Sequence, residues 1–356
     1  MRYYSLDRIN RYNATYNIVI GERSNGKTYA VLKQVIYEYF KTGGQLAIVR
    51  RWKEDITGAR ASNMFRALEE NGEILKASKG EFEGIHYWAG AFYLCSYDDK
   101  GKAIYSDQDI IAYPFALSQT EHNKSISFPK VTTILFDEFL TRSLYLNEEF
   151  VLLMNTISTI VRQRSDVKIY MLANTVNKYS PYFEEMGLTN IKEQEQGTID
   201  LYKYGNSKLT VAVEYTASNK KSKESNFYFA FNNPKLEMIT GGAWEIGIYP
   251  HIPFKFTPKD IKHIFFIEFN DELFQCEIVK RDKDLFIYIH RKTTDLQTEH
   301  EHVYSIVPNS NIMYNNSIKK PRNKIEKLIL QLFTNGKVFY QDNSVGDTIR
   351  NYLNTI

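Results

Sequence analysis

Short apolar runs rich in β-branched residues recur along the first half of the chain. They lie at residues 16–20, 45–50, 131–136 and 167–173, and helical or mixed segments separate them. Uninterrupted apolar runs of this length are typical of parallel strands that are buried on both faces. Strands that alternate with helices predict an α/β fold with a mainly parallel sheet and helices on both faces.

Other segments of the first half have different periodicities. Residues 29–40 are helix-forming, and residues 148–161 have apolar positions at helical spacing. Residues 86–96 and 103–118 instead alternate apolar and polar positions on either side of a turn-forming segment at 96–102. This alternation predicts an antiparallel addition to the parallel sheet.

The second half begins with a change in amino-acid composition. Polar and charged residues dominate from 187 to 224, which predicts a linker. Three alternating strands at 263–269, 273–279 and 285–290 then predict a β-meander, and amphipathic helices follow at 324–333 and 345–353. We therefore expect three parts, which are a first domain at 1–186, a linker at 187–225 and a smaller α+β domain at 226–356.

The first apolar run leads into a glycine-rich segment that matches the P-loop pattern GxxxxGK[ST]. The segment consists of Gly21, Glu22, Arg23, Ser24, Asn25, Gly26, Lys27 and Thr28. A strand before it and a helix after it are the context that a phosphate-binding loop requires, which argues against a chance match. Backbone N–H groups and the helix N-terminus would face a polyphosphate. We expect Lys27 to reach the β- and γ-phosphates of ATP and the Thr28 hydroxyl to bind Mg²⁺.

Polar side chains follow two of the other apolar runs. Asp137 and Glu138 come directly after the third run, and we expect their strand to lie beside the P-loop strand. Asp137 would then hold Mg²⁺ through water and Glu138 would polarise the attacking water, although two acids can also simply end a strand. The vicinal pair favours ATPases that do mechanical work. Asn174 follows the fourth run, where it is either a γ-phosphate contact or a turn residue.

Composition narrows the class of protein further. The chain has 356 residues, a net charge of +3, and two cysteines that form no metal or redox motif. No apolar run approaches membrane-spanning length, and the first residues lack a signal-peptide core. These features predict a cytoplasmic protein without a membrane partner.

In their order and local context, the motifs resemble those of the DNA-packaging ATPases (encapsidation proteins) of phi-29-like podophages, which are minimal relatives of the large terminases. The P-loop carries Arg23 at its third position, as is typical of packaging ATPases. Further matches are residues 49–53, 133–139, 161–164 and 172–174. The likeness covers residues 5–185, whereas the second half matches only in its outline of a meander followed by helices.

The resemblance implies an ASCE-type P-loop ATPase domain in a homopentameric ring. Such a ring would dock on the portal (connector) of a prohead in the infected bacterial cytoplasm, bind double-stranded DNA and a structural prohead RNA, and use ATP and Mg²⁺ to drive DNA inward. By this analogy Arg162 is an arginine finger that reaches a neighbouring subunit, and Lys53 is a second trans-acting cation. Arg162 and Arg164 can also be ordinary helix-end cations, and Arg50 and Arg51 are close enough to share the task of Lys53.

For the second domain the resemblance implies an RNase H-like fold. A nuclease of that fold needs several carboxylates around two metal ions. Glu268 is the one inward-capable acid of the first meander strand, with Asn270 and Asp271 in the turn, so we expect a degenerate nuclease in which Glu268 is structural. The basic stretch at 319–324 would follow a DNA or RNA backbone or form a solvated face.

Three other functions compete with a translocating ATPase. A nucleotide-gated protein that binds nucleic acid or the portal would need no water-polarising acid, so Glu138 argues against it. The same residue, and the absence of an arginine-rich lid, disfavours a small-molecule P-loop kinase. A filamentous-phage assembly or conjugation ATPase would need a membrane anchor, for which the sequence shows no segment.

Overall fold

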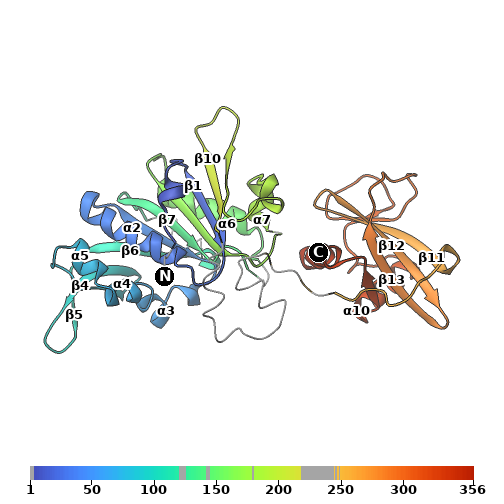
Figure 1. The fold of residues 1–356 in the computed structure, drawn as a ribbon, viewed down its shortest axis with the longest axis horizontal. Coiled ribbons are helices and arrows are strands. Elements are labelled where there is room, and N and C mark those ends of the chain that lie inside the picture. Colours follow the sequence, from blue (N-terminus) through green and yellow to red (C-terminus); the bar gives the residue numbers. More distant parts are fainter. Residues whose placement is uncertain are drawn as a thin grey trace. The chain divides into compact units, whose positions relative to one another are not determined.

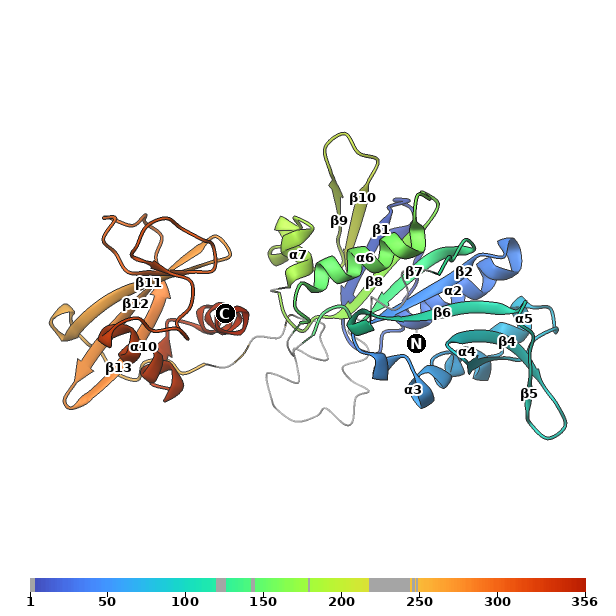
Figure 2. The ribbon, with the colours of Figure 1, turned by 180° about the vertical axis from the view of Figure 1, so that it is seen from behind.

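The computed structural model describes residues 4–119, 126–141, 145–178, 180–217, 244, 247 and 249–356. The chain divides into two compact units, residues 1–245 and residues 246–356. In Figures 1 and 2 the N-terminal unit runs from blue to yellow-green and the C-terminal unit from orange to red. Each unit has its own sheet and its own hydrophobic core. Within the described ranges, no helix is long and apolar enough to cross a membrane.

The N-terminal unit is built on a ten-stranded sheet in the order β3-β4-β6-β2-β7-β8-β1-β10-β9, with β5 paired to β4. Its strands are β1 (Tyr16–Gly21), β2 (Gln45–Arg50), β3 (Gly84–Trp88), β4 (Ala91–Tyr97), β5 (Ala103–Ile104), β6 (Ile110–Ala116), β7 (Val131–Asp137), β8 (Lys168–Asn174), β9 (Ile199–Lys203) and β10 (Thr210–Tyr215). In the part of this order that runs β6-β2-β7-β8-β1-β10, each strand is parallel to its neighbours. The predicted mainly parallel sheet is therefore confirmed.

Helices cover both faces of this sheet. They are α1 (Asp7–Asn10), α2 (Lys27–Thr42), α3 (Gly58–Ser62), α4 (Arg66–Glu70), α5 (Glu73–Ala77), α6 (Glu149–Val161) and α7 (Pro181–Glu185). Alternate residues of β1 enter two separate cores: Val19 packs with α2, whereas Ile18 and Ile20 pack with α6 and α7. Figures 1 and 2 show α2 and α6 on opposite sides of the strands.

The antiparallel addition lies at one edge of the sheet. The strand β4 pairs antiparallel with both β3 and β5, as the alternating pattern predicts. The strand β6 was expected to belong to the same addition, but it pairs antiparallel with β4 and parallel with β2. It therefore joins the hairpins to the parallel part of the sheet.

The predicted linker at 187–225 differs from the structure over its middle part. Residues 199–203 and 210–215 form β9 and β10, and β10 pairs in parallel with β1. The strand β10 is buried from Val211 to Tyr215 because β1 offers it an open edge and apolar neighbours. The first unit extends to residue 245 instead of 186, and the segment 218–224 lies outside the described residues.

The position of β7 also differs from the expectation. The strand that carries Asp137 does not lie beside the P-loop strand β1, because β8 pairs with both of them. An additional strand between these two is the feature that the term ASCE describes, so the order agrees with the fold that the resemblance implies.

The C-terminal unit contains a six-stranded sheet in the order β15-β14-β11-β12-β13-β16. Its elements are β11 (Ile261–Phe269), β12 (Glu272–Arg281), β13 (Asp284–Arg291), β14 (Val303–Ser305), β15 (Tyr314–Asn315), α10 (Lys324–Thr334), β16 (Val338–Tyr340) and α11 (Asn343–Thr355). The predicted meander is present as the antiparallel strands β11, β12 and β13. Outside it, β14 pairs in parallel with β11, and β16 pairs in parallel with β13.

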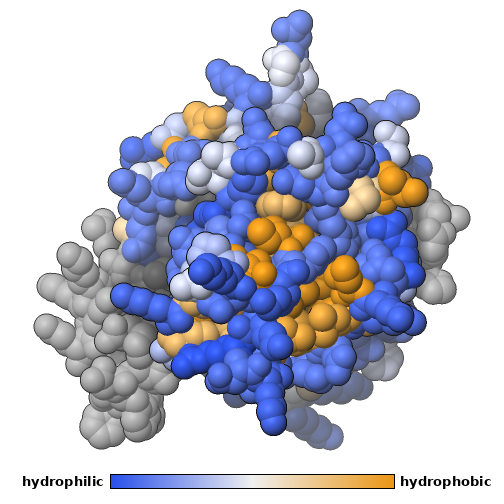
Figure 3. Space-filling view, turned by 90° about the vertical axis from the view of Figure 1, so that its right-hand side faces the viewer, coloured by the Kyte–Doolittle hydropathy of each residue, from blue (hydrophilic) through white to orange (hydrophobic). Residues whose placement is uncertain are grey.

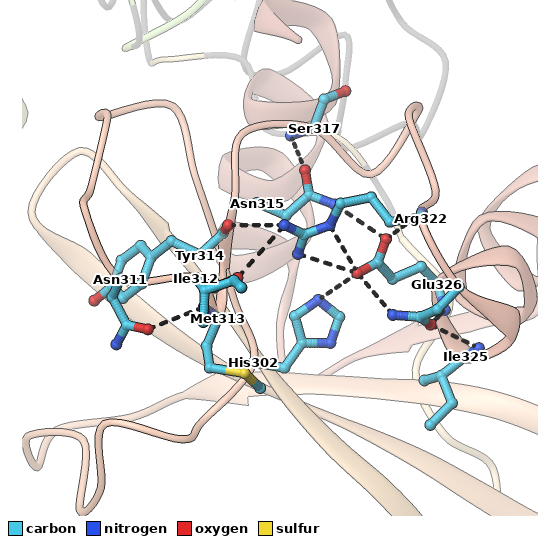
Figure 4. A network of polar contacts seen from close by, with 11 residues as sticks. His302, Asn311, Ile312, Met313, Tyr314, Asn315, Ser317, Arg322, Ile325 and Glu326 are labelled. Atoms are coloured by element: carbon cyan, nitrogen blue, oxygen red, sulfur yellow. Dashed lines mark hydrogen bonds and ion pairs between the residues drawn. The ribbon is translucent and has the colours of Figure 1, made fainter.

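A buried carboxylate organises the start of α10 (Figure 4). Glu326 is 1% exposed, and its oxygens accept hydrogen bonds from the Arg322 backbone N–H at 2.5 Å and from Asn315 Nδ2 at 3.3 Å. The Arg322 guanidinium lies 3.2 Å from Oε1, and His302 Nε2 lies 3.6 Å from the same atom. The stretch 319–324 was expected to follow a nucleic-acid backbone or to form a solvated face, but Arg322 takes part in this network.

The Glu326 network predicts acid sensitivity of the C-terminal unit. Burial would raise the pKa of Glu326, but hydrogen bonds and charge from Arg322 outweigh it, so the pKa lies below the ordinary 4.5. Burial also lowers the pKa of His302 below the ordinary 6.5. Both groups bind protons more readily in the unfolded chain, so stability should fall as the pH drops below 6.5 and fall further below 4.5.

We expect Glu326→Gln to lower the free energy of unfolding at pH 7 by about 1–3 kcal/mol, because a charged acceptor in a hydrogen-bond network is removed. The same variant should also lose the part of the acid response below pH 4.5. Thermal unfolding of the full chain from pH 3.5 to 8 measures both effects. Glu268→Gln, at an exposed position on β11, is the matched control. An unchanged pH profile in Glu326→Gln would contradict this prediction.

Candidate nucleotide-binding site

The carboxyl ends of three adjacent strands form one side of a cavity in the N-terminal unit. Register places Gly21 of β1 opposite Asn174 of β8, and Asp137 of β7 opposite Leu172 of β8. The cavity has a volume of about 430 Å³ and is lined by Arg23, Ser24, Asn25, Gly26, Lys27, Thr28, Tyr29, Asp137, Glu138, Ala173 and Asn174. The structure therefore brings together the P-loop, the acidic pair and the strand-end Asn174. Lys53 and Arg162 are not among the lining residues.

The structure explains why glycine stands at two positions of the loop. Gly26 precedes α2 with φ +89°, a left-handed conformation that residues with a Cβ rarely adopt. A Cβ on Gly21 would lie 1.8 Å from Thr216 Oγ1, just after β10. Glycine at position 21 thus depends on a strand that the sequence pattern did not predict.

The Lys27 ammonium is held inside the loop. Its Nζ donates to the Glu22 carbonyl at 2.7 Å and lies 3.4 Å from Asn174 Oδ1. Burial lowers the pKa of Lys27 to about 8, although the charges of Asp137 and Glu22 oppose the shift. An anion in the cavity would favour the charged form of Lys27, as a polyphosphate requires.

Thr28 and Asp137 meet across the cavity floor. The Thr28 Oγ1 lies 3.2 Å from both carboxylate oxygens of Asp137. Burial and the charge of Glu138 raise the pKa of Asp137, while Arg50, Thr28 and Lys27 act to lower it. A hydroxyl and a carboxylate at this spacing are the hard oxygen ligands that Mg²⁺ prefers, so these residues fit a magnesium site.

Arg50 lies between the two acids at the end of β7, a position that the sequence did not predict. Its guanidinium lies at the end of β2, with Nη2 2.9 Å from Asp137 Oδ2 and Nη1 2.8 Å from Glu138 Oε2. One arginine therefore bridges both acids of its own chain. The only signal in the sequence was its place at the end of a strand, because the pairing of β2 with β7 is a tertiary feature.

The candidate trans-acting residues lie elsewhere on the unit. Arg51 is buried against Glu149 and, like Arg50, is engaged within its own chain. Lys53 is exposed in a short 3-10 helix. Arg162 follows the last residue of α6, is exposed, and donates to the carbonyl of Ile126 at 3.1 Å. A role of Lys53 or Arg162 in a neighbouring subunit stays a prediction.

The strand order and the loop between β1 and α2 define the architecture of P-loop proteins. Comparison with protein families narrows this class. The chain belongs to the Podovirus DNA encapsidation protein (Gp16) family, which matches residues 1–351.

The chain is also similar to curated relatives and to solved structures. The DNA packaging protein of Bacillus phage phi29 is 30% identical over 184 residues, which are 51% of this chain and 49% of the relative. The chain thus spans about half the length of the curated relatives it matches. Among solved structures, the Phi-28 gp11 DNA packaging motor has a TM-score of 0.54 at 19% identity and covers 99% of this chain and 98% of its own. The bacteriophage Phi-29 viral genome packaging motor assembly has a TM-score of 0.55 at 22% identity, covering 98% and 96%, and both structures show the fold.

Proposed function

We propose that the chain is the ATPase of a viral DNA-packaging motor, which couples ATP hydrolysis to movement of double-stranded DNA into a prohead. The observation that carries the proposal is the convergence of Lys27, the Thr28–Asp137 pair and Glu138 on one cavity in a chain of the encapsidation family. The phi29 relative is a DNA packaging protein, and the two structures with the same fold are a DNA packaging motor and a viral genome packaging motor assembly.

The side chains divide the chemistry among them. The loop N–H groups and Lys27 would hold the β- and γ-phosphates of ATP, while Thr28 and Asp137 would hold Mg²⁺, whose charge stabilises the phosphates. Glu138 would accept the proton of the attacking water, and its side chain lines the cavity and is 66% exposed. Asn174, at the end of β8, would contact the γ-phosphate or that water.

The assembly is part of the same proposal. We infer a homopentameric ring on the portal vertex of a prohead in the host cytoplasm, with DNA and a structural prohead RNA as further partners. Arg162 and Lys53 would act on the nucleotide of a neighbouring subunit. Their support is positional: both are exposed and neither lines the cavity of its own chain.

For residues 246–356 we propose an RNase H-like domain that binds nucleic acid without cutting it. The meander, with β14 parallel to its first strand, supports this fold. Glu268 was expected to be an inward-capable, structural acid, but it is exposed. The described residues hold no group of three or more His, Cys, Asp or Glu that could bind a metal ion. Loss of nuclease activity remains a prediction. Lys320 and Lys324 are exposed and would contact phosphates.

The decisive experiment measures ATP hydrolysis with and without double-stranded DNA. We expect DNA to stimulate the wild-type rate strongly, because a motor hydrolyses ATP when engaged with its track. Glu138→Gln should bind ATP normally and lower kcat by about 10²–10⁴-fold, since an amide cannot accept the proton. Glu148→Gln, the same chemical change at an exposed residue before α6, is the control. Hydrolysis indifferent to DNA would instead favour a nucleotide-gated binding protein.

The role of Arg162 can be tested by complementation between two inactive variants. A residue that acts only in its own chain would not give such complementation. Arg162→Ala subunits should bind ATP but hydrolyse it about 10³–10⁵-fold more slowly if the finger is removed. Mixing them with Glu138→Gln subunits should restore activity, because some interfaces then pair an intact Glu138 with an intact Arg162. Arg164→Ala, whose guanidinium donates to carbonyls of its own chain, is the control and should not need complementation. Mixed assemblies that form but stay inactive would show that Arg162 is not a finger.

The C-terminal proposal predicts salt-sensitive binding to DNA of any sequence. Removal of one lysine that binds a phosphate should reduce the slope of log K against log salt by about 0.9, so Lys320→Ala and Lys324→Ala should each flatten it by about that amount. Lys283→Ala, at an exposed position in the β12–β13 turn, is the matched control. Figure 3 shows one face of the molecule, on which apolar areas lie between polar residues. Salt-insensitive or absent DNA binding would favour docking on the portal through such apolar surface.

A further inference from the structure

Two consecutive arginines at the end of β2 contact different parts of the β7 end. Arg50 pairs with the carboxylates of Asp137 and Glu138. Arg51 instead donates to backbone carbonyls, with Nη2 2.7 Å from the Phe139 oxygen and Nη1 3.4 Å from the Glu138 oxygen. Side chain and peptide of Glu138 therefore have separate partners on the neighbouring strand.

A buried acid holds Arg51 in place. Arg51 Nε and Nη2 lie 2.7 and 2.8 Å from the two carboxylate oxygens of Glu149, whose side chain is 0% exposed. Glu149 also accepts from the Tyr182 hydroxyl at 2.5 Å and from the Leu146 N–H at 2.7 Å. The ring of Tyr145 lies 5.1 Å from Arg51 Cζ. Each oxygen of Glu149 thus has two donors, so the fork has one well-determined geometry.

The backbone at Glu138 needs such support. Glu138 has φ +60°, a left-handed conformation that is disfavoured for a residue with a Cβ and persists when surrounding contacts over-determine it. The contacts from Arg51 fall on the carbonyls of Glu138 and of the next residue. A lysine could neutralise Glu149 but could not form the planar fork and donate to two carbonyls at once.

We propose that Arg51, held by Glu149, is a positioning residue for Glu138. It fixes the peptide that carries the water-polarising carboxylate and so sets where that carboxylate points. The proposal rests on the function proposed above. It assigns to Arg51 a task within its own subunit.

The test is the kinetics of Arg51→Lys alone and in a Glu138→Gln background. We expect kcat to fall by about 10²-fold, because small misplacement of a catalytic group costs about that much, while the KM for ATP stays near wild type. In the Glu138→Gln background Arg51→Lys should cause no further fall, because the group it positions is already disabled. Arg66→Lys, the same change at an exposed arginine that pairs with Glu70, is the matched control and should leave kcat near wild type.

Several outcomes would overturn the proposal. These are an additive fall in the double variant, an effect on KM alone, an unchanged kcat in folded Arg51→Lys, or an equal loss of kcat in Arg66→Lys. If circular dichroism shows that Arg51→Lys does not fold, Glu149→Gln, which releases the fork and keeps the side-chain shape, undergoes the same cycle. A wild-type chain without ATPase activity would instead refute the proposed function, which separates the two failures.

Discussion

Burial of charge at the carboxyl edge of one sheet is the constraint on which the N-terminal unit depends. The ends of β2 and β7 and the starts of α2 and α6 place Arg50, Arg51, Lys27, Asp137 and Glu149 where little water reaches. A buried charge without a partner costs several kcal/mol, so each of these groups must meet an opposite charge or a carbonyl. The resulting ion pairs join elements far apart in the sequence. They hold the strand ends in the arrangement that the cavity needs.

The same constraint makes the cavity responsive to an anionic ligand. Lys27 is a desolvated cation whose pKa is lowered to about 8, and Asp137 is a desolvated acid whose pKa is raised. A polyphosphate with a divalent cation would supply the opposite charge for both groups. The free energy of their burial then becomes part of the free energy of binding. Helix α6 extends this connection, since it begins at Glu149 and Arg162 follows its last residue.

The C-terminal unit also buries a charged group and surrounds it with hydrogen-bond and ion-pair partners. Glu326 is buried at the start of α10, and Arg322, Asn315 and His302 surround it. This network joins β14 and β15 to α10 by charge-assisted hydrogen bonds instead of apolar contacts alone. Arg322, within the basic stretch 319–324, therefore has a structural role. Lys319 donates to the Ile356 carbonyl, whereas Lys320 and Lys324 are exposed.

The sequence by itself determined the features that depend on neighbouring residues. The P-loop, the vicinal Asp137 and Glu138, the parallel strands and the C-terminal meander all follow from local patterns, because glycine conformations and strand periodicity act over a few residues. Only the tertiary structure decided which partners the charges would have. Arg50 and Arg51 looked alike in the sequence, yet Arg50 binds Asp137, 87 residues away, and Arg51 binds Glu149, 98 residues away. Likewise β10 became a strand, and the Thr216 side chain came to lie close to Gly21, because of pairing between segments about 195 residues apart. Local propensity carries no information about such distant neighbours, whose contacts are set by packing of the whole unit.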